Sequence, residues 1–460
     1  MKRFLRLGFV LCLYVICSGC GEVFRPIIIP NPPTFPNPAA AHTVVSINDN
    51  GTVVPGSAMV IDVSGDTDVS VADVGLAPVH AVQQTASQFL VVNHSVTGAV
   101  ADSLTKLSFN GILIFGATTI SLPPNSAPNF VATTESSQAY VLLPSYLDPV
   151  TNTVVPSVGV VNTLSNNLVA AIPVGNNPVA MAETPNTEKL YVANQGDGTL
   201  SAFNTFDQSS RSISGTFTSP PIWLSARSDS QRVYALEVNG TLAWLDTTST
   251  AGPDTLTETT ISVPGATKMV YDGNRNRLYV PGGTQVAIVD VSQAAPSTIA
   301  SIPITAIPPA SRGAQDPCST TAVTTLITVD VAALPDGSRA YVGTYYEDAS
   351  DNICPQVTVI DAVSNAIKTS TAIPGFTAYD AFCSASQSQR APRFRIMMAA
   401  GGDSTRAYLS SCDGGNVNIV DTSTDTYIVN EPAPVSNSRP PIPPSQQNPP
   451  QNPVFLIAGP

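Results

Sequence analysis

Asn or Asp recurs along this 460-residue chain at the end of a short apolar run. The positions are Asp62, Asn162, Asn204, Asp246, Asp290, Asp361 and Asp421. A ring of such carboxylates could hold a metal ion or act as general acids and bases. Short polar side chains in these places also bond the backbone two residues on and so start the next hairpin, and we expect this structural role.

A basic residue stands two positions before a tyrosine at five further places. They are Lys189, Arg232, Arg277, Arg339 and Arg406. Gathered on one face these cations could bind an anion, but positions in separate repeats would lie far apart. Acidic or turn residues such as Asp229, Asp336 and Asp403 are close by in the sequence. We therefore expect these basic side chains to form solvent-exposed ion pairs with such residues at the turn just before each tyrosine strand.

Motifs of known enzyme classes are missing from the sequence. There is no His-Glu-x-x-His, no Gly-x-Ser-x-Gly, no P-loop and no Cys-x-x-Cys-His. Three histidines cannot supply the rings of ligands that copper or haem propellers use. We predict no catalytic residue, no metal site and no cofactor, and a binding protein rather than an enzyme. The formal charge of -13 would repel phosphates, so nucleic acid is not an expected partner.

A tyrosine phrase repeated six times indicates the fold. Its copies are Ala139-Tyr140-Val141, Leu190-Tyr191-Val192, Val233-Tyr234-Ala235, Leu278-Tyr279-Val280, Ala340-Tyr341-Val342 and Ala407-Tyr408-Leu409. Short β-patterned runs repeating every ~40 to 65 residues are typical of propeller blades, because one such unit cannot bury its apolar faces alone. We expect an all-β propeller of four-stranded antiparallel blades, with strands a to d running outward from the axis.

The two ends of the chain complete one blade in this interpretation. Residues 42 to 74 contain three strands, b, c and d, without a strand a. Residues 452 to 460 match the pattern of strand a in the copy at residues 177 to 185. A composite blade would remove the open edges of the ring. We predict eight blades, with seven as the alternative, and a single domain over residues 42–460.

Four cysteines of the propeller fit two disulfides. In a blade, the loop entering strand a and the loop joining b to c open on the same face. Cys318 and Cys354 occupy these two places in one blade, and Cys383 and Cys412 occupy them in the next. We therefore predict Cys318–Cys354 and Cys383–Cys412.

Several segments resemble the repeats of the YVTN family of bacterial β-propellers. They include Tyr191-Val192-Ala193-Asn194, Gly198-Thr199-Leu200-Ser201 and Val357-Thr358-Val359-Ile360-Asp361. The likeness covers nearly everything from residue 42 to 460 and is weaker at 78 to 122 and at 376 to 400. It implies an extracytoplasmic, surface-associated propeller with a heterogeneous or unknown role, and it transfers no catalytic residue.

The N-terminus indicates export. Basic residues precede an apolar run from Leu7 to Cys17, which is too short to span ~30 Å of hydrocarbon. Cys17-Ser18-Gly19-Cys20 resembles a bacterial lipobox with Cys in place of the usual Leu. We expect a signal peptide at residues 1–19, a lipidated Cys20 and a Pro-rich tether at 20–41, with an unmodified Cys20 as the alternative. Gly21 favours the outer membrane, on its periplasmic side or at the cell surface.

Two long insertions suggest where the molecule binds a partner. Residues 305–325 and 377–393 lengthen consecutive blade entrances, and the loop at 345–351 adds aromatics and carboxylates. Loops held on a rigid scaffold often carry binding sites. The candidate face comprises Arg312, Asp316, Tyr345, Tyr346, Glu347, Asp348, Asp351, Tyr379 and Phe382. We expect a lipid-anchored scaffold for a protein, peptide or glycan partner. The alternatives are a metal-assisted or lactonase-like hydrolase using carboxylates at the channel, and a purely structural envelope component.

Overall fold

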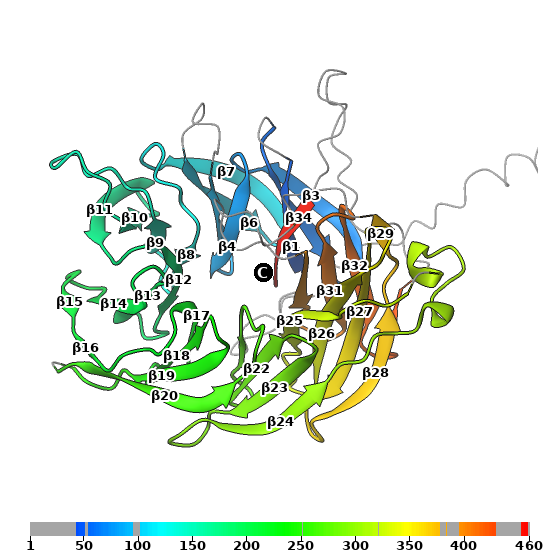
Figure 1. Ribbon diagram of the computed structural model, residues 1–460. Helices are drawn as coiled ribbons and strands as arrows, with labels where there is room; N and C mark the ends of the chain where they lie inside the picture. Colours follow the sequence, from blue (N-terminus) through cyan, green and yellow to red (C-terminus); the bar gives the residue numbers. More distant parts are fainter. Residues whose placement is uncertain are drawn as a thin grey trace, which may run out of the picture. The chain divides into compact units, whose positions relative to one another are not determined.

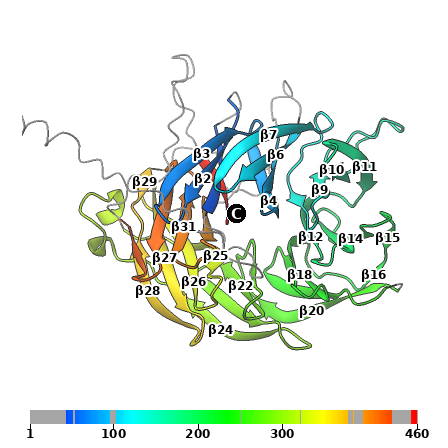
Figure 2. The ribbon, with the colours of Figure 1, turned by 180° about the vertical axis from the view of Figure 1, so that it is seen from behind.

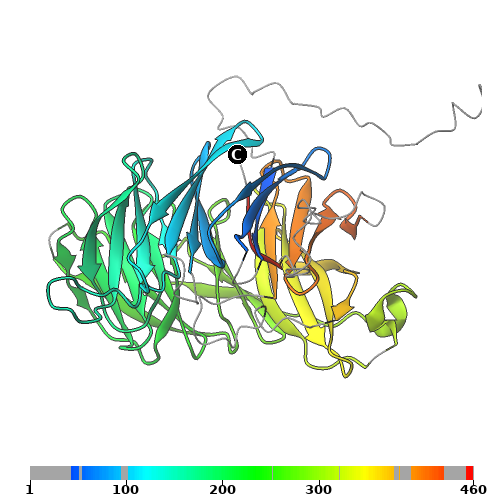
Figure 3. The same ribbon diagram turned by 90° about the horizontal axis from the view of Figure 1, so that it is seen from above.

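The computed structural model describes residues 43–50, 54–94, 102–250, 252–320, 322–377, 383, 395–428 and 452–458. These residues form eight antiparallel sheets arranged as blades around a central axis, which confirms the predicted all-β propeller (Figure 1). Figures 2 and 3 show the same ring from behind and from above. No helix among the described residues is long and apolar enough to cross a membrane. The expected signal peptide, Cys20 and the tether lie outside the described residues.

Each of the first four blades has four strands, from an innermost strand at the axis to an outermost one at the rim. Blade 1 is β34 (Asn452–Ala458), β1 (Thr43–Asp49), β2 (Ser57–Asp62) and β3 (Thr67–Asp73). Blade 2 is β4 (Pro78–Thr85), β5 (Gln88–Asn93), β6 (Ser103–Asn110) and β7 (Leu113–Ser121). Blade 3 is β8 (Val131–Ala132), β9 (Gln138–Leu143), β10 (Ser157–Asn162) and β11 (Asn167–Pro173). Blade 4 is β12 (Pro178–Glu183), β13 (Lys189–Asn194), β14 (Thr199–Asn204) and β15 (Ser210–Arg211).

The remaining blades follow the same order, with short additions. Blade 5 is β17 (Pro221–Ala226), β18 (Arg232–Glu237), β19 (Thr241–Asp246) and β20 (Asp254–Ser262), with β16 (Ile213–Ser214) parallel to β20. Blade 6 is β21 (Val270–Asp272), β22 (Arg277–Gly282), β23 (Gln285–Asp290) and β24 (Ser297–Pro303). Blade 7 is β25 (Ile327–Ala333), β26 (Arg339–Glu347), β27 (Asn352–Asp361) and β28 (Ala366–Ala372), with β29 (Phe376–Thr377) paired to β27. Blade 8 is β30 (Ile396–Ala400), β31 (Arg406–Ser411), β32 (Asn416–Asp421) and β33 (Thr426–Tyr427). Two 3-10 turns, η1 (Pro309–Ser311) and η2 (Pro317–Ser319), precede blade 7.

Blade 1 closes the ring as the sequence predicts. Strand β34 pairs antiparallel with β1, with Ile47 opposite Phe455 and Val44 opposite Ala458. In Figure 1 the red β34 lies beside the blue β1 near the axis. The last strand of the chain therefore satisfies the inner edge of the first one and joins both ends of the propeller in one sheet. The predicted count of eight blades is confirmed.

The core lies between neighbouring blades because the second strand of each blade is covered on both sides. All six residues of β13 are buried, whereas the outermost strand β11 alternates between exposed and partly buried residues. Tyr140, Tyr191, Tyr234, Tyr279, Tyr341 and Tyr408 are among the largest fully buried side chains. The repeated tyrosine phrase is thus the part of each blade that packs against its neighbours.

The recurrent basic residues join each blade to the next one. Arg277 Nη1 donates to the carbonyl oxygen of Ala362 at 2.7 Å, and Arg339 Nη1 lies 2.7 Å from Asp425 Oδ1. Each of the five basic residues has an acceptor in or just after the turn between strands c and d of the following blade, and Arg406 pairs in addition with Asp421 of its own blade. The expected solvated pairing at the preceding a–b turn is therefore wrong. These cations lie in partly buried interfaces, where charge-assisted hydrogen bonds are stronger than in water.

Tyrosine hydroxyls take part in the same contacts. Tyr191 Oη donates to Asp254 Oδ2 at 2.8 Å, and Tyr341 Oη donates to Asp425 Oδ1. Burial raises the pKa of the Tyr191 hydroxyl, and the charge of Asp254 raises it further. Both phenols therefore remain protonated donors at neutral pH, and they tie the second strand of one blade to the outer half of the next.

The Asn or Asp at the end of strand c starts the next turn, as predicted. Asp246 Oδ1 accepts the N–H of Thr248 at 2.9 Å, and Asp421 Oδ1 accepts the N–H of Ser423 at 2.7 Å. Asp62, Asn162, Asp290 and Asp361 make the same bond to the second residue on. Asn204 differs, because its side chain bonds Ser209 and Arg211 instead. The recurrent carboxylates thus make turns rather than a catalytic ring.

Candidate functional site

The upper face of the propeller is the side on which each innermost strand begins. Both predicted disulfides lie on this side and are confirmed: Cys318–Cys354 and Cys383–Cys412, with Cα atoms 5.8 and 5.7 Å apart. Cys318, Asp348 and Cys354 also place three potential metal-ligand atoms within 4.8 Å of one another. Because the two sulfur atoms are bonded to each other, neither offers a thiolate to a metal.

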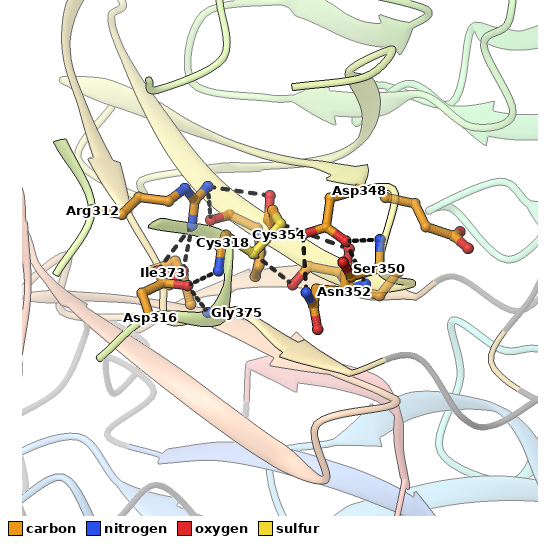
Figure 4. The surroundings of a disulfide bond; sticks show 12 residues. Arg312, Asp316, Cys318, Asp348, Ser350, Asn352, Cys354, Ile373 and Gly375 are labelled. Atoms are coloured by element: carbon orange, nitrogen blue, oxygen red, sulfur yellow. Dashed lines mark hydrogen bonds and ion pairs between the residues drawn. A yellow bond between two sulfur atoms is a disulfide. The ribbon is translucent and has the colours of Figure 1, made fainter. Parts of the chain in front are cut away.

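Four residues of the predicted binding face lie around the Cys318–Cys354 disulfide: Arg312, Asp316, Tyr346 and Asp348. Figure 4 labels three of them, Arg312, Asp316 and Asp348. The guanidinium of Arg312 is fully buried, forms an ion pair with Asp316 at 3.2 Å and donates to the Ile373 carbonyl oxygen at 3.1 Å. Its Cζ atom lies 5.5 Å from the ring centre of the buried Tyr346. Asp348 is buried as well, and its Oδ1 accepts the N–H groups of Ser350 and Asn352. These four residues brace the loops and do not present a surface to a partner.

Three other residues of the predicted face reach solvent. Asp351 is exposed, Tyr345 is partly exposed, and the Glu347 side chain is 46% exposed and 4.0 Å from Arg395 of blade 8. Burial raises the pKa of the Tyr345 hydroxyl, so it stays neutral. Tyr379 and Phe382 lie outside the described residues. Of the predicted face, the structure therefore leaves Tyr345, Glu347 and Asp351 accessible to a partner, whereas the four residues around the Cys318–Cys354 disulfide support it.

The axis holds a second candidate site that sequence reasoning missed. One position in each innermost segment pairs with, or lies opposite, the residue two positions after the tyrosine of the neighbouring strand b, as Trp223 pairs with Leu236 and Asp330 with Gly343. In blades 1 and 2, which lack the tyrosine, the corresponding pairs are Phe455 with Ile47 and His80 with Val92. We call these eight positions the axial layer. In blade order they are Phe455, His80, Phe130, Ala180, Trp223, Lys268, Asp330 and Met397.

Six of the eight axial-layer side chains form a continuous series of contacts. The ring of His80 stacks on Phe130 at 3.9 Å between centroids and meets Phe455 at 4.7 Å. Phe130 meets Trp223 edge-on at 6.0 Å, and Lys268 Nζ lies 5.6 Å from the Trp223 ring centre. The layer is thus an aromatic wall that ends in a cation.

The polar end of the layer is an ion pair between two innermost segments. Lys268 Nζ lies 2.7 Å from Asp330 Oδ1, and the two side chains are 8% and 1% exposed. Asp330 also accepts the N–H of Val331 at 2.7 Å and that of Met398 at 2.9 Å. A buried carboxylate with this many donors is held in one position.

His80 stays neutral in this environment. Burial, reinforced by the positive charge of Lys268, lowers its pKa to about 3. Nδ1 accepts the N–H of Val131 at 3.4 Å, so the neutral ring carries its proton on Nε2. Because His80, Trp223 and Phe455 are each partly exposed, the layer offers a ligand flat apolar surfaces together with ring N–H donors.

A signal for the axial layer exists in the sequence. Three innermost strands contain, at or one residue after their start, Pro, a β-branched residue and then an aromatic ring: Pro78-Val79-His80, Pro221-Ile222-Trp223 and Pro453-Val454-Phe455. Blade 4 has Ala180 at the aromatic position. Alignment of the innermost strands alone would have shown large rings where crowding at the axis favours small side chains.

Comparisons with known proteins identify the fold and no family. No protein-family model matches the chain, and no curated protein matches its sequence. A structure of apo AztD from Citrobacter koseri and another structure of AztD from the same organism each match with a TM-score of 0.56 and 10% identity. Both alignments cover 90% of this chain and 97% of AztD. A functionally unknown protein from Desulfotomaculum acetoxidans matches at 0.49 and 13% identity, over 72% of this chain and 95% of that one. At such identities the likeness to AztD shows the shared propeller fold alone.

Proposed function

We propose that the protein is an exported binding protein that holds a partner with flat, ring-shaped groups, such as a glycan, over the axial layer. The single observation that carries this proposal is the contact series from Phe455 through His80, Phe130 and Trp223 to the buried pair Lys268–Asp330. Sugar rings present apolar faces to aromatic side chains and hydroxyls to N–H donors. A pre-formed wall loses little side-chain entropy on binding.

The hydrolase alternative requires available carboxylates at the axis. Asp330 is the one carboxylate among the eight axial-layer residues, and its oxygens already bond Lys268 and two backbone N–H groups. A carboxylate committed in this way is a poor general base, because it would have to give up a buried ion pair. No contact in the layer favours hydrolysis over binding.

The expected location is part of the proposal. A lipid on Cys20 would tether the propeller to the outer membrane through the Pro-rich segment. The resemblance to YVTN-repeat propellers and the two disulfides agree with an extracytoplasmic protein. Metabolic labelling with radioactive palmitate tests this part: the wild type should incorporate label and Cys20→Ala should not. Equal labelling would contradict a lipid anchor at this cysteine.

Tryptophan fluorescence tests the axial site directly. The chain has two tryptophans, Trp223 in the axial layer and Trp244 on β19 under the guanidinium of Arg232. In the Trp244→Phe variant the tryptophan emission therefore comes from Trp223 at the axis alone. The Trp223→Phe variant, which retains Trp244, is its matched control. We expect soluble oligosaccharides of glucose or N-acetylglucosamine to shift the emission of the first variant only. Equal responses from both variants, or none from either, would refute a glycan site at the axis.

A further inference from the structure

One of the six blades that carry the tyrosine phrase lacks the basic residue that the other five have. A basic residue stands two positions before the tyrosine in five of the six tyrosine-bearing blades: Lys189, Arg232, Arg277, Arg339 and Arg406. Blade 3 has Gln138 in this place, and its amide Nε2 reaches only as far as Tyr140 Oη. The next blade therefore receives no positive charge from this position.

The acceptor that a cation would bind is present in blade 4. The residue after the Asn or Asp of strand c offers its carbonyl oxygen to a basic side chain of the preceding blade in five blades. The pairs are Thr163 with Lys106, Thr247 with Lys189, Val291 with Arg227, Ala362 with Arg277 and Thr422 with Arg339. Thr205 holds this position in blade 4, and no basic side chain among the described residues donates to its carbonyl oxygen. Among the described residues, Val63 of blade 1 and Gly111 of blade 2 also receive no basic side chain at this position. Thr205 differs from them because the blade before it carries the tyrosine phrase without its basic residue.

A buried carboxyl group lies at the same interface. Glu183 is 6% exposed, and neither of its oxygens has a hydrogen-bond partner in the described part of the chain. Thr134 lies beside it, but its hydroxyl donates to the carbonyl oxygen of Thr184. The charges of Glu183 and Glu135 act on each other and on Tyr140. Burying a carboxylate without a counter-charge is costly, so a cation entering here would be bound strongly.

A crevice gives access to this interface from the lower face of the propeller, which is the face opposite the two disulfides. Its volume is about 670 Å³, and its lining includes Glu135, Gln138, Glu188, Thr205, Phe206 and Asp207. Lys189 and Arg211 also line it, and both pair with the buried Asp254. Residues 247–250 of blade 5 belong to the lining as well. The remaining charges in the lining are three carboxylates. Phe206 is 99% exposed beside them and offers an apolar surface next to these charges.

We propose that the crevice between blades 3 and 4 binds an arginine or lysine side chain of a partner peptide. The guanidinium or ammonium group takes the position that the chain's own cations take at five other interfaces, close to the Thr205 carbonyl oxygen. The rim carboxylates neutralise it, and an apolar residue next to it in the peptide packs on Phe206. This site lies on the face opposite the disulfides and is independent of the axial layer.

Fluorescence polarisation with labelled peptides tests the proposal on the intact protein. The probes are heptapeptides with one central arginine flanked by leucine or phenylalanine, and the same peptides with citrulline, which has the same shape and no charge. We expect binding of an arginine peptide that weakens as salt rises, and at least tenfold weaker binding of its citrulline counterpart. Equal affinities, or no binding by any arginine peptide, would overturn the proposal.

Matched variants locate the binding. Gln138→Arg supplies the missing cation from within the chain and should weaken peptide binding at least tenfold, whereas Trp223→Phe should leave it unchanged. Phe206→Ser should weaken binding about threefold. Its control is Val363→Ser, at the equivalent exposed position of blade 7, which should have no effect. Unchanged binding in Gln138→Arg, or displacement of the peptide by micromolar calcium, would contradict a site for a basic side chain.

Discussion

The interface from blade 7 to blade 8 and the interface from blade 3 to blade 4 share one backbone arrangement and differ in a few side chains. In the first, Arg339 Nη1 lies 2.7 Å from Asp425 Oδ1, Tyr341 donates to the same oxygen, and Lys368 Nζ lies 2.7 Å from Oδ2. In the second, Gln138 replaces the arginine and Glu183 is left without a hydrogen-bond partner among the described residues. The buried carboxylate of the first interface is thus paired with cations, whereas the buried carboxyl group of the second is not paired with one among the described residues. We call the first interface complete and the second incomplete.

A repeat protein can therefore acquire a site without changing its fold. The tyrosine phrase fixes the strands of both interfaces, so exchanging one side chain for a shorter, neutral one leaves the backbone in place. What changes is the charge balance of a partly buried space. A carboxyl group that its own chain does not neutralise becomes a place for an outside cation.

The largest effect should come from breaking the complete interface. Arg339→Gln leaves the buried Asp425 with Lys368 as its one remaining cation among the described residues, and we expect a loss of about 3 kcal/mol in the free energy of unfolding. Urea titration at pH 7 measures this loss. Arg232→Gln is the matched control, because Arg232 donates to a carbonyl oxygen, that of Gln293, and removing it should cost about 1 kcal/mol or less. Equal losses in the two variants would contradict the importance of the buried carboxylate.

The pH dependence of stability sharpens the comparison at the incomplete interface. Burial raises the pKa of Glu183 from 4.5 to about 7. The folded protein therefore binds more protons than the unfolded chain between these values, and its stability falls as the pH rises through this window. Below pH 4.5 both states are protonated and the cost is absent, whereas above pH 7 it is fully present. Glu183→Gln should match the wild type near pH 4 and exceed it by about 2 kcal/mol at pH 8.

Thermal unfolding across this range provides the check on Glu183→Gln. Glu188→Gln, an exposed neighbour on the same blade, should leave the profile of the wild type nearly unchanged. If the stability of the wild type and that of Glu183→Gln changed with pH in the same way, the raised pKa of Glu183 in the folded protein would be contradicted.

The sequence predicted the scaffold well because repetition carries the same information many times. Six copies of the tyrosine phrase defined the second strands, and the match between residues 452–458 and an innermost strand identified the composite blade. The disulfide pairs followed from the same register. Each of these features depends on strand order along the chain, which a pattern of apolar residues specifies.

The candidate sites were less predictable because they depend on contacts between blades. Arg312 and Asp348 looked like exposed loop residues, yet both are buried as supports of a disulfide. His80 and Trp223 are 143 positions apart, and only closure of the ring brings them into one layer. Gln138 stands where five other copies of the tyrosine phrase have a basic residue, and we did not single it out from the sequence. Its importance emerged only when the acceptors in the next blade were known.

The smallest effect should come from completing the incomplete interface. Gln138→Arg places a guanidinium near the Thr205 carbonyl oxygen and Glu183, in the way that Arg339 meets Thr422 and Asp425. A new charge-assisted bond to a partly buried carboxylate should raise the free energy of unfolding by about 1 kcal/mol at pH 8. The same change should lower the pKa of Glu183 and so reduce the loss of stability between pH 4.5 and 7. A destabilised variant with an unchanged pH profile would mean that the two interfaces are not equivalent, and that the space beside Gln138 does not accept a cation.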